Sequence, residues 1–337
     1  MKGITVSGDG AYAEFQPGLT SGELLRALWA QGKETVTGSC LCAGIMGIML
    51  GGGHGYLQGL YGFPTDQILE MRVVLANGTL AVASAEENED LFWGLRGAGH
   101  NFGIVTLTRY KVYPSGPKWS QARLVFPGSH LEQIFTLSND YLSIDSHPAG
   151  LILWYVFSRR PDLAQEPVIV MDLIYRGDLA ELENLSSRFI ALGALEVSMY
   201  TEIEYPDLYK LNTIDETSVV CKKGAYRHLF RSYLKRHSPE ALRAVYNIFS
   251  NVITRTPVWT YYNESYAADI LSATQDMKRI IVESSGEGQQ NSYVNYAVGD
   301  ETLAEIYGSA PWRVEKLKRL KSQYDPQGKF NFYLPLA

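Results

Sequence analysis

The sequence predicts an α+β protein of two domains, and three observations support this. The chain has 337 residues, which exceeds the roughly 250–300 residues that one hydrophobic core usually organises. A proline- and glycine-rich break, 114–117, separates two regions of different character. Beyond it, strand-like runs and amphipathic helices mix without strict βαβ alternation, which favours a mainly antiparallel sheet flanked by helices.

The first region begins with strand signals followed by a helix. Residues 11–16 alternate between apolar and polar types and end at Pro17 and Gly18, which is typical of a strand that runs into a turn. Thr20 and Ser21 are residue types that cap a helix, and we expect that helix over 22–31.

A hairpin, a helix and a further strand follow in the first region. The β-branched run 66–76 predicts a strand, and Asn77-Gly78 before 79–82 predicts a two-residue hairpin. The acidic start of 88–95 predicts a helix. The run 104–113 predicts a strand.

The second region combines long strands with amphipathic helices. The expected strands are 151–158, 167–175, 258–262 and 292–296. The expected helices are 131–142, 179–192 and 239–253, and a basic helix, 312–324, ends the chain. Their hydrophobic periodicities are the basis of these assignments.

Composition and charge exclude several classes of partner. The chain is 46% hydrophobic and 20% charged, with a net charge of −6, which gives no electrostatic reason to expect nucleic acid or an anionic membrane. An apolar run of about 18 residues, which would suggest a transmembrane helix, does not occur. The first residues have no hydrophobic core of a secretory signal as written.

Three cysteines occur, at positions 40, 42 and 221. Three is too few for a disulfide framework. The Cys40-Leu-Cys42 spacing is also shorter than the usual C-x₂₋₄-C zinc spacing and has no second pair. We therefore expect neither a disulfide framework nor a metal site.

The stretch 38–55 is the most informative part of the chain, because seven of its eighteen residues are glycine. Each glycine costs about 0.5–1 kcal/mol in the interior of a helix or strand, so we expect irregular backbone here. Such backbone can approach a large planar or anionic ligand closely and donate N–H groups to it. A tightly packed turn is the alternative interpretation.

Four segments, in order, resemble the berberine bridge enzyme-like oxidoreductases, a group within the vanillyl-alcohol oxidase type of proteins with a PCMH-type FAD-binding domain. These segments are GSCLCAGIMGIMLGGGHGYLQGLYGFPTD (38–66), VVLANGTL…ENEDLFWGLRGAGHNFGIVT (73–106), SYVNY (292–296) and YDPQGKFNF (324–332). The resemblance covers nearly the whole chain and is weakest over 118–255. On these segments the chain resembles a member of this group of flavoproteins.

The resemblance implies an FAD-binding domain over 1–116, a substrate domain over 117–298 and a C-terminal segment, 299–337, that returns to the first domain. Relatives begin with a further segment that carries a pyrophosphate-binding loop and an Arg-Ser-Gly-Gly-His motif, whose histidine attaches to flavin. This sequence starts after that segment, so the expected FAD-binding domain is incomplete at its N-terminus. Either the start is misassigned and the protein is longer and secreted, or the chain binds flavin weakly or has lost it.

The resemblance also implies which residues contact FAD. Cys40 matches a cysteine that forms a thioether to flavin C6, whereas the histidine attachment site is absent. Ala43 matches a position beside flavin C4a, where a small side chain leaves room for oxygen. The implied cofactor-binding residues are Gly38, Ser39, Cys40, Ala43, Gly44, Gly51, Gly52, Gly53, Gly55, Gly99, Asn101, Gly103, Ile104, Val105 and Asn295.

In this family a tyrosine or glutamate removes a substrate proton while hydride passes to flavin N5. The candidates here are Tyr261, Tyr262, Glu264 and Tyr293. The resemblance thus implies oxidation of a small organic substrate, a specialised metabolite, with O₂ as the electron acceptor. Two alternatives remain at this point: a flavin-free descendant that acts as a cyclase or pericyclase-type template, and a non-catalytic partner protein.

Overall fold

The computed structural model describes residues 1–143, 147–224, 234–255, 267–285 and 291–336. The chain divides into two compact units. The first contains Met1–Gly116, Pro206–Lys222 and Asn291–Ala337, and the second contains Pro117–Tyr205 and Lys223–Gln290. Residues 206–222 and 291–298 therefore belong to the first unit, whereas the sequence placed both in the second.

The first unit is built on a five-stranded antiparallel sheet. Its strand order is β1-β2-β6-β4-β5, with bounds β1 Ile4–Val6, β2 Tyr12–Phe15, β4 Ile68–Leu75, β5 Leu80–Ser84 and β6 Gly103–Lys111. A small pair, β3 Lys33–Glu34 and β7 Tyr113–Pro114, completes the strands described in this unit. Long β6 lies at the centre of the sheet because it pairs with both β2 and β4.

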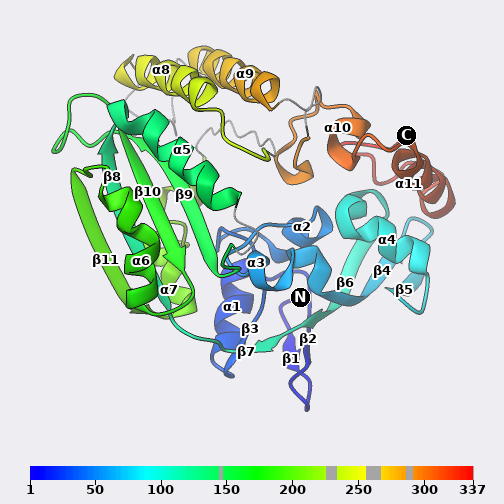
Figure 1. Cartoon of the computed structure of the whole chain (residues 1–337). Helices are drawn as coiled ribbons and strands as arrows, with labels where there is room; N and C mark the ends of the chain where they lie inside the picture. The colour runs from blue at the N-terminus through cyan, green and yellow to red at the C-terminus, as the bar shows by residue number, and fades with distance from the viewer. Residues whose placement is uncertain (144–146, 225–233, 256–266, 286–290, 337) are drawn as a thin grey trace. The chain divides into compact units, whose positions relative to one another are not determined.

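Several helices belong to the first unit (Figure 1). They are α1 Ser21–Trp29, α2 Ile45–Leu50, α3 Gln58–Tyr61, α4 Glu89–Ala98, α10 Leu303–Tyr307 and α11 Pro311–Tyr324, and α7 Tyr205–Leu211 begins at the boundary. Buried residues of α1, α2, α4 and α11 join the core of the sheet. The predicted Thr20 cap is confirmed: Thr20 Oγ1 accepts from Glu23 N, and Thr20 N donates to Glu23 Oε2. This capping box satisfies two backbone donors and fixes the start of α1.

The hairpin between β4 and β5 forms, but its loop is longer than predicted. Val74 pairs with Leu80, and Leu75 N donates to Thr79 O at 2.9 Å. The loop is therefore the three residues 76–78, with Gly78 at φ 85°. The prediction of a two-residue turn was wrong by one residue, because a glycine in the left-handed region also closes three-residue loops.

The second unit has a four-stranded antiparallel sheet of order β11-β8-β10-β9. The strands are β8 Trp119–Pro127, β9 Leu151–Ser158, β10 Val168–Tyr175 and β11 Glu196–Ile203. The helices described in this unit are α5 Leu131–Leu142, α6 Leu179–Ile190, α8 Pro239–Arg255 and α9 Ala267–Ser284. Strands β8 and β11 and helix α9 were not predicted, whereas α5 and β9 have the predicted bounds.

The core of the second unit lies between one face of this sheet and helices α5 and α6 (Figure 1). Buried apolar residues alternate along β8 and recur on the inner faces of the helices. The core includes Leu124, Phe126, Ile134, Met171, Leu182 and Phe189. Full burial of such side chains contributes about 1.5–3 kcal/mol each, so the amphipathic patterns that predicted these helices also account for their packing.

Two local predictions about the first unit were wrong. The glycine-rich stretch contains a short helix, α2, because its apolar residues pack into the core: Ile45 and Met49 are fully buried. The stretch predicted as a strand at 292–296 instead contains a 3₁₀ turn, Val294–Tyr296. Among the described residues, no helix has both the length and the apolar character that crossing a bilayer requires.

Candidate functional site

The glycine-rich stretch is fastened to the start of α1 by backbone hydrogen bonds. Ser21 N donates to Ala43 O at 2.9 Å, and Gly22 N donates to Leu41 O at 3.0 Å. Ile45 N donates to Leu19 O at 3.0 Å. The loop that precedes α2 is therefore held like an added strand, which fixes the position of the backbone from Leu41 to Ile45.

Four glycines of this stretch are required by close packing within the protein. A Cβ at Gly38 or Gly53 would overlap the side chain of Ile48, and a Cβ at Gly51 would overlap the amide of Asn295. A Cβ at Gly55 would overlap the backbone carbonyl of Thr37. For these positions the structure supports the packed-turn interpretation that the sequence left open.

Other glycines of the same stretch face open space. A Cβ at Gly44 or Gly47 would meet no atom within 4 Å, and both residues are exposed. Gly52 has φ +104°, and the nearest atom to its added Cβ would be a ring carbon of Tyr293 at 3.9 Å. The start of α2 thus presents bare backbone on one side, while its other side is packed.

A second glycine-containing segment, 97–103, lies against the end of α2. Gly97, at φ 145°, interrupts the helical backbone of α4. A Cβ at Gly99 would overlap the side chain of Leu50, and a Cβ at Gly103 would overlap Val73. The absence of side chains at these positions lets the two segments approach closely.

The residues that follow Gly99 differ sharply in burial. Asn101 is fully buried and its amide donates to Ala98 O at 3.4 Å. At the start of β6, the side chain of Ile104 is 60% exposed, whereas Val105 is buried. Ile104 therefore offers an apolar surface to solvent beside the second glycine segment.

A buried ion pair near the C-terminus holds this second segment in place. Lys321 Nζ lies 2.7 Å from Asp325 Oδ2, and their side chains are 2% and 0% exposed. The same ammonium donates to Asn101 O at 2.9 Å and to Phe330 O at 3.1 Å. Burial raises the pKa of Asp325, but hydrogen bonds from Lys321 and from the backbone of 329–330 outweigh it and lower that pKa overall.

Tyr293 and Asn295 lie together beside the first glycine stretch. Asn295 Nδ2 donates to Ile48 O at 3.1 Å and to the Tyr293 hydroxyl at 2.7 Å. The ring of Tyr293, which is 8% exposed, packs edge-on against His54 with centroids 4.9 Å apart. The structure thus brings both residues to the predicted cofactor segment, through a 3₁₀ turn instead of a strand face.

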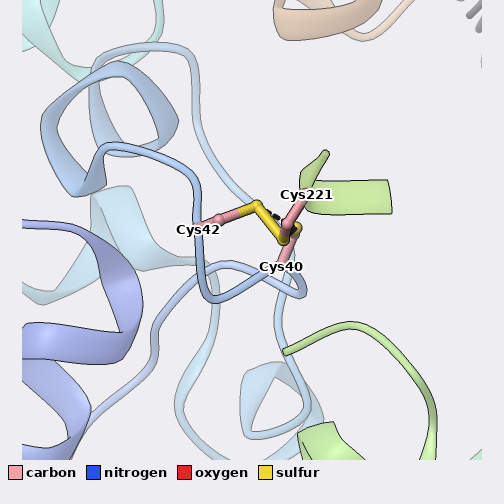
Figure 2. Close-up of side chains that lie close together, drawn as sticks. All are labelled: Cys40, Cys42 and Cys221. Atoms are coloured by element: carbon pink, nitrogen blue, oxygen red, sulfur yellow. Dashed lines mark hydrogen bonds between the residues drawn. A yellow bond between two sulfur atoms is a disulfide. The ribbon is translucent and has the colours of Figure 1, made fainter. Parts of the chain in front are cut away.

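The cysteines form a compact group (Figure 2). Cys42 and Cys221 are joined by a disulfide, which the sequence did not predict. The free Cys40 has its Sγ 3.3 Å from Cys42 Sγ and 3.6 Å from Cys221 Sγ. The three sulfur atoms are close enough to be three ligands of one metal ion, but the two in the disulfide are not thiolates in this form.

The predicted residues Tyr261, Tyr262 and Glu264 lie outside the described residues, as does the predicted strand 258–262. Sequence reasoning missed Lys321 and the role of Cys221. Lys321 lies three residues before the YDPQGKFNF motif that the resemblance used, one helical turn from the aspartate of that motif, and this i, i+4 spacing to Asp325 was the available signal. Cys221 offered no local signal, because its partner is 179 residues away.

Comparison with known proteins places this geometry in a family. The profile described as FAD binding domain matches residues 1–84. The FAD-linked oxidoreductase chry5 of Gibberella zeae is 34% identical over an alignment that covers all of this chain and 75% of the relative. The chain belongs to the FAD-linked oxidoreductases. It is an FAD-dependent oxidoreductase, and FAD is the cofactor of this family.

Solved structures show the fold of this family. A chitooligosaccharide oxidase superposes with a TM-score of 0.79 at 19% identity, over 100% of this chain and 80% of the other. BBE-like 1 of Physcomitrella patens gives a TM-score of 0.79 at 23% identity, with the same coverage. The mixed helix-and-sheet architecture is therefore that of the berberine bridge enzyme-like and vanillyl-alcohol oxidase-type flavoproteins.

The residues present are compatible with FAD. No atom lies within 4 Å of an added Cβ at Gly44 or Gly47, which is the kind of open backbone that a flat ring can approach. The exposed Ile104 supplies apolar surface for an aromatic group. By contrast, Gly38, Gly51, Gly53 and Gly55 are accounted for by protein packing alone, so their predicted cofactor contacts stay a prediction.

Proposed function

We propose that the protein oxidises a small organic substrate of specialised metabolism and uses O₂ as the electron acceptor. Family membership over the whole chain is the observation that carries this proposal. When bound, FAD supplies a two-electron acceptor at flavin N5. The protein must therefore hold the ring, orient the substrate and accept a proton.

The open side of the glycine-rich stretch is the proposed flavin surface. Gly44 and Gly52 are positions of the predicted set where the space beside the backbone is open: no atom lies within 4 Å of an added Cβ at Gly44, and at Gly52 the nearest is a ring carbon of Tyr293 at 3.9 Å. Ile104 would contact the cofactor from the second glycine segment. The packed glycines would act indirectly, because they let α2 and its flanking loops keep this arrangement.

Cys40 is the proposed covalent attachment point. It is a free thiol, it is partly exposed, and it lies four residues before Gly44 at the edge of the same stretch. Intact-mass measurement after denaturation tests this step: a flavin adduct that disappears in Cys40→Ala would support it. Release of all flavin from the wild-type protein on denaturation would contradict it.

Tyr262 is the proposed base that accepts the substrate proton, with Tyr261 and Glu264 as neighbours in the sequence. For Tyr293 we propose a positioning role instead. Its hydroxyl accepts a hydrogen bond from Asn295 and its ring is buried, so the side chain is fixed in place. A tyrosine that is fixed beside α2 can hold the groups around it in the orientation that a reaction needs.

O₂ as acceptor is favoured by two observations. Ala43, at the predicted oxygen-access position, carries only a methyl group. In addition, solved neighbours are named oxidases, among them the chitooligosaccharide oxidase. Oxygen consumption by the purified protein with a panel of phenols and secondary alcohols tests the proposal, and reduction of an artificial dye without oxygen consumption would contradict it.

The base assignment has its own test. Replacement of Tyr262 by Phe should lower kcat by about 10²–10⁴-fold, the usual contribution of a general base, at unchanged FAD content. Tyr12→Phe is the matched control, because Tyr12 lies on β2 and stacks with Arg109 outside the proposed site. If Tyr262→Phe turned over like the wild type, the base would be another residue.

A further inference from the structure

The turn that joins β4 to β5 carries an inference that is independent of the oxidoreductase activity. Its residues Asn77-Gly78-Thr79 match the Asn-x-Ser/Thr sequon, in which x is not proline and the asparagine can accept an N-linked glycan. The same pattern occurs at Asn184-Leu-Ser and at Asn263-Glu-Ser, and the second of these lies outside the described residues. Because a three-residue pattern also arises by chance, the local structure has to distinguish an acceptor from a coincidence.

The sequon at Asn77 is folded into a hydrogen-bonded turn. Thr79 N donates to Asn77 Oδ1 at 3.0 Å, and Thr79 Oγ1 donates to the same oxygen at 2.7 Å. This arrangement is an Asx turn, which forms between residues two positions apart and needs no tertiary contact. Asn77, Gly78 and Thr79 are all exposed. An enzyme can therefore reach the side-chain amide and the hydroxyl together, already in a turn.

A glycan has room at this position. Strand β5, which follows the sequon, is the last strand of its sheet. Gly78 has φ 85°, and no described atom lies within 4 Å of a Cβ added to it. On the other side of Asn77, the Ala76 carbonyl accepts a hydrogen bond from Lys329 Nζ at 2.8 Å, which fixes the base of the loop. The hairpin thus holds Asn77 at the surface, where bulky hydrophilic groups such as glycans are accommodated.

The sequon at Asn184 has the opposite environment. It lies within α6, where residues i and i+2 do not face each other, so Ser186 cannot close the turn that Thr79 closes. Ser186 is fully buried, and its hydroxyl donates to Glu183 O at 3.3 Å. A transferase that must contact both residues of the sequon has no access to this serine in the folded chain. Asn184 is therefore a matched negative control within the same protein.

The disulfide supplies an independent observation about the compartment. N-linked glycans are attached in the lumen of the endoplasmic reticulum, an oxidising compartment in which disulfides form and persist, whereas disulfides are rare in cytosolic proteins. Cys42 and Cys221 are joined although 179 residues separate them. A chain that acquires this bond in the lumen also meets the glycosylation machinery there. The free Cys40 takes no part in this inference.

We propose that Asn77 is an N-glycosylation site of this protein. Asn77 Nδ2 attacks the anomeric carbon of an oligosaccharide that is carried on a lipid pyrophosphate. The C–N bond forms, the bond between that carbon and the pyrophosphate oxygen breaks, and Nδ2 gives up one proton to solvent. The lipid pyrophosphate leaves with the bonding electron pair, and nothing is oxidised or reduced.

Glycopeptide mapping of the full chain tests the proposal. The chain is expressed in a eukaryotic host behind a cleavable secretory leader, and its tryptic peptides are analysed by mass spectrometry. We expect the peptide with Asn77 to carry an N-linked glycan that an endoglycosidase removes, and the peptide with Asn184 to be unmodified. Thr79→Ser should keep the glycan, whereas Thr79→Ala should lose it although the Asn77 amide is unchanged.

Asn77→Asp is the variant that preserves the turn. Its carboxylate can accept the same two hydrogen bonds from Thr79, but it has no nitrogen to which a sugar can be attached. We expect this variant to carry no glycan at position 77 and to unfold at the temperature of the enzymatically deglycosylated wild type. It therefore tests the site even if Thr79→Ala does not fold.

Several outcomes would overturn the proposal. These are an unmodified Asn77 in the secreted protein, a glycan on Asn184 but not on Asn77, and a glycan on Asn77 that survives Thr79→Ala. Absence of the Asn77 glycopeptide from the protein purified from its own source cells would overturn it as well. Flavin content, read from the visible absorbance of the same samples, reports the oxidoreductase proposal separately.

Discussion

Each unit contains a buried acid–base pair, and the surroundings of the two pairs differ. Lys321 and Asp325 in the first unit are 2% and 0% exposed, and backbone groups satisfy both side chains. Arg123 and Asp172 in the second unit are 25% and 8% exposed, with nitrogen and oxygen 2.7 Å apart. The Lys321–Asp325 pair is therefore buried, whereas the Arg123–Asp172 pair is partly accessible to solvent.

The pairs also join different kinds of segment. Lys321 connects the C-terminal helix to the carbonyl of Asn101, 220 residues away. Arg123 and Asp172 are direct cross-strand partners on β8 and β10, which a ladder of backbone hydrogen bonds already joins. The pair in the first unit therefore joins segments that no strand ladder connects, whereas the pair in the second unit reinforces two strands that are already hydrogen-bonded.

The largest expected effect is at Lys321. Replacement by Met would leave the Asp325 carboxylate buried without its partner, and breaking a buried pair costs about 3–5 kcal/mol. Urea unfolding, combined with hydrogen exchange resolved by peptide, should show loss of protection in 97–111 before 119–175. Lys318→Met, at an exposed position of the same helix, is the control; equal stability of the two variants would contradict the comparison.

The glycines of 38–55 should respond in opposite directions. Gly55→Ala would push a methyl group into the Thr37 carbonyl, and overpacking of this kind costs about 1–3 kcal/mol. Gly47→Ala adds a methyl group in open space on helix α2 and should stabilise the apoprotein by about 0.5–1 kcal/mol. Thermal unfolding measures both.

The FAD affinity of the Gly47→Ala variant gives a separate prediction. If the ring lies on the open side of α2, Gly47→Ala should weaken FAD binding while it raises the unfolding temperature of the apoprotein. Titration of the apoprotein with FAD, followed by flavin fluorescence, measures the affinity. Unchanged affinity would place the flavin elsewhere.

A smaller effect is expected in the second unit. Asp172→Asn removes the charge that faces Arg123 but keeps a hydrogen-bond acceptor, and Gln121 Nε2 also bonds to this side chain at 2.8 Å. Because Arg123 is partly solvated, the loss should be about 1 kcal/mol, below the range for fully buried charged hydrogen bonds. Hydrogen exchange of peptides from β8 and β10 measures it, and a loss as large as that at Lys321 would remove the distinction between the pairs.

The pH dependence should also separate the pairs. The pKa of Asp325 is lowered in the folded protein from 3.8, so its contribution is complete above pH 3.8 and is lost as the pH falls through the lower, folded value. Acid should therefore expose the C-terminal segment of the first unit. Asp325→Asn should abolish this part of the acid transition in circular dichroism, and a transition identical to the wild type would assign it to other groups.

The sequence by itself determined the elements whose signals are local. Helix α5 and strand β9 have the predicted bounds, because amphipathic periodicity and β-branched runs report on neighbours a few residues away. The Thr20 cap was predictable for the same reason. The four ordered motifs also sufficed to predict the FAD-linked family, since each is a short run of sequence that can be recognised without knowing the fold.

Only the tertiary structure decided what depends on distant residues. It placed a 3₁₀ turn, Val294–Tyr296, where a strand was predicted, and it divided the glycines of 38–55 into packed and open positions. It also joined Cys42 to Cys221 and buried Lys321 beneath Asn101. The partners in these contacts lie more than 100 residues apart in most cases. A local sequence pattern depends only on residues close together in the chain, so it cannot predict which distant residues folding brings into contact.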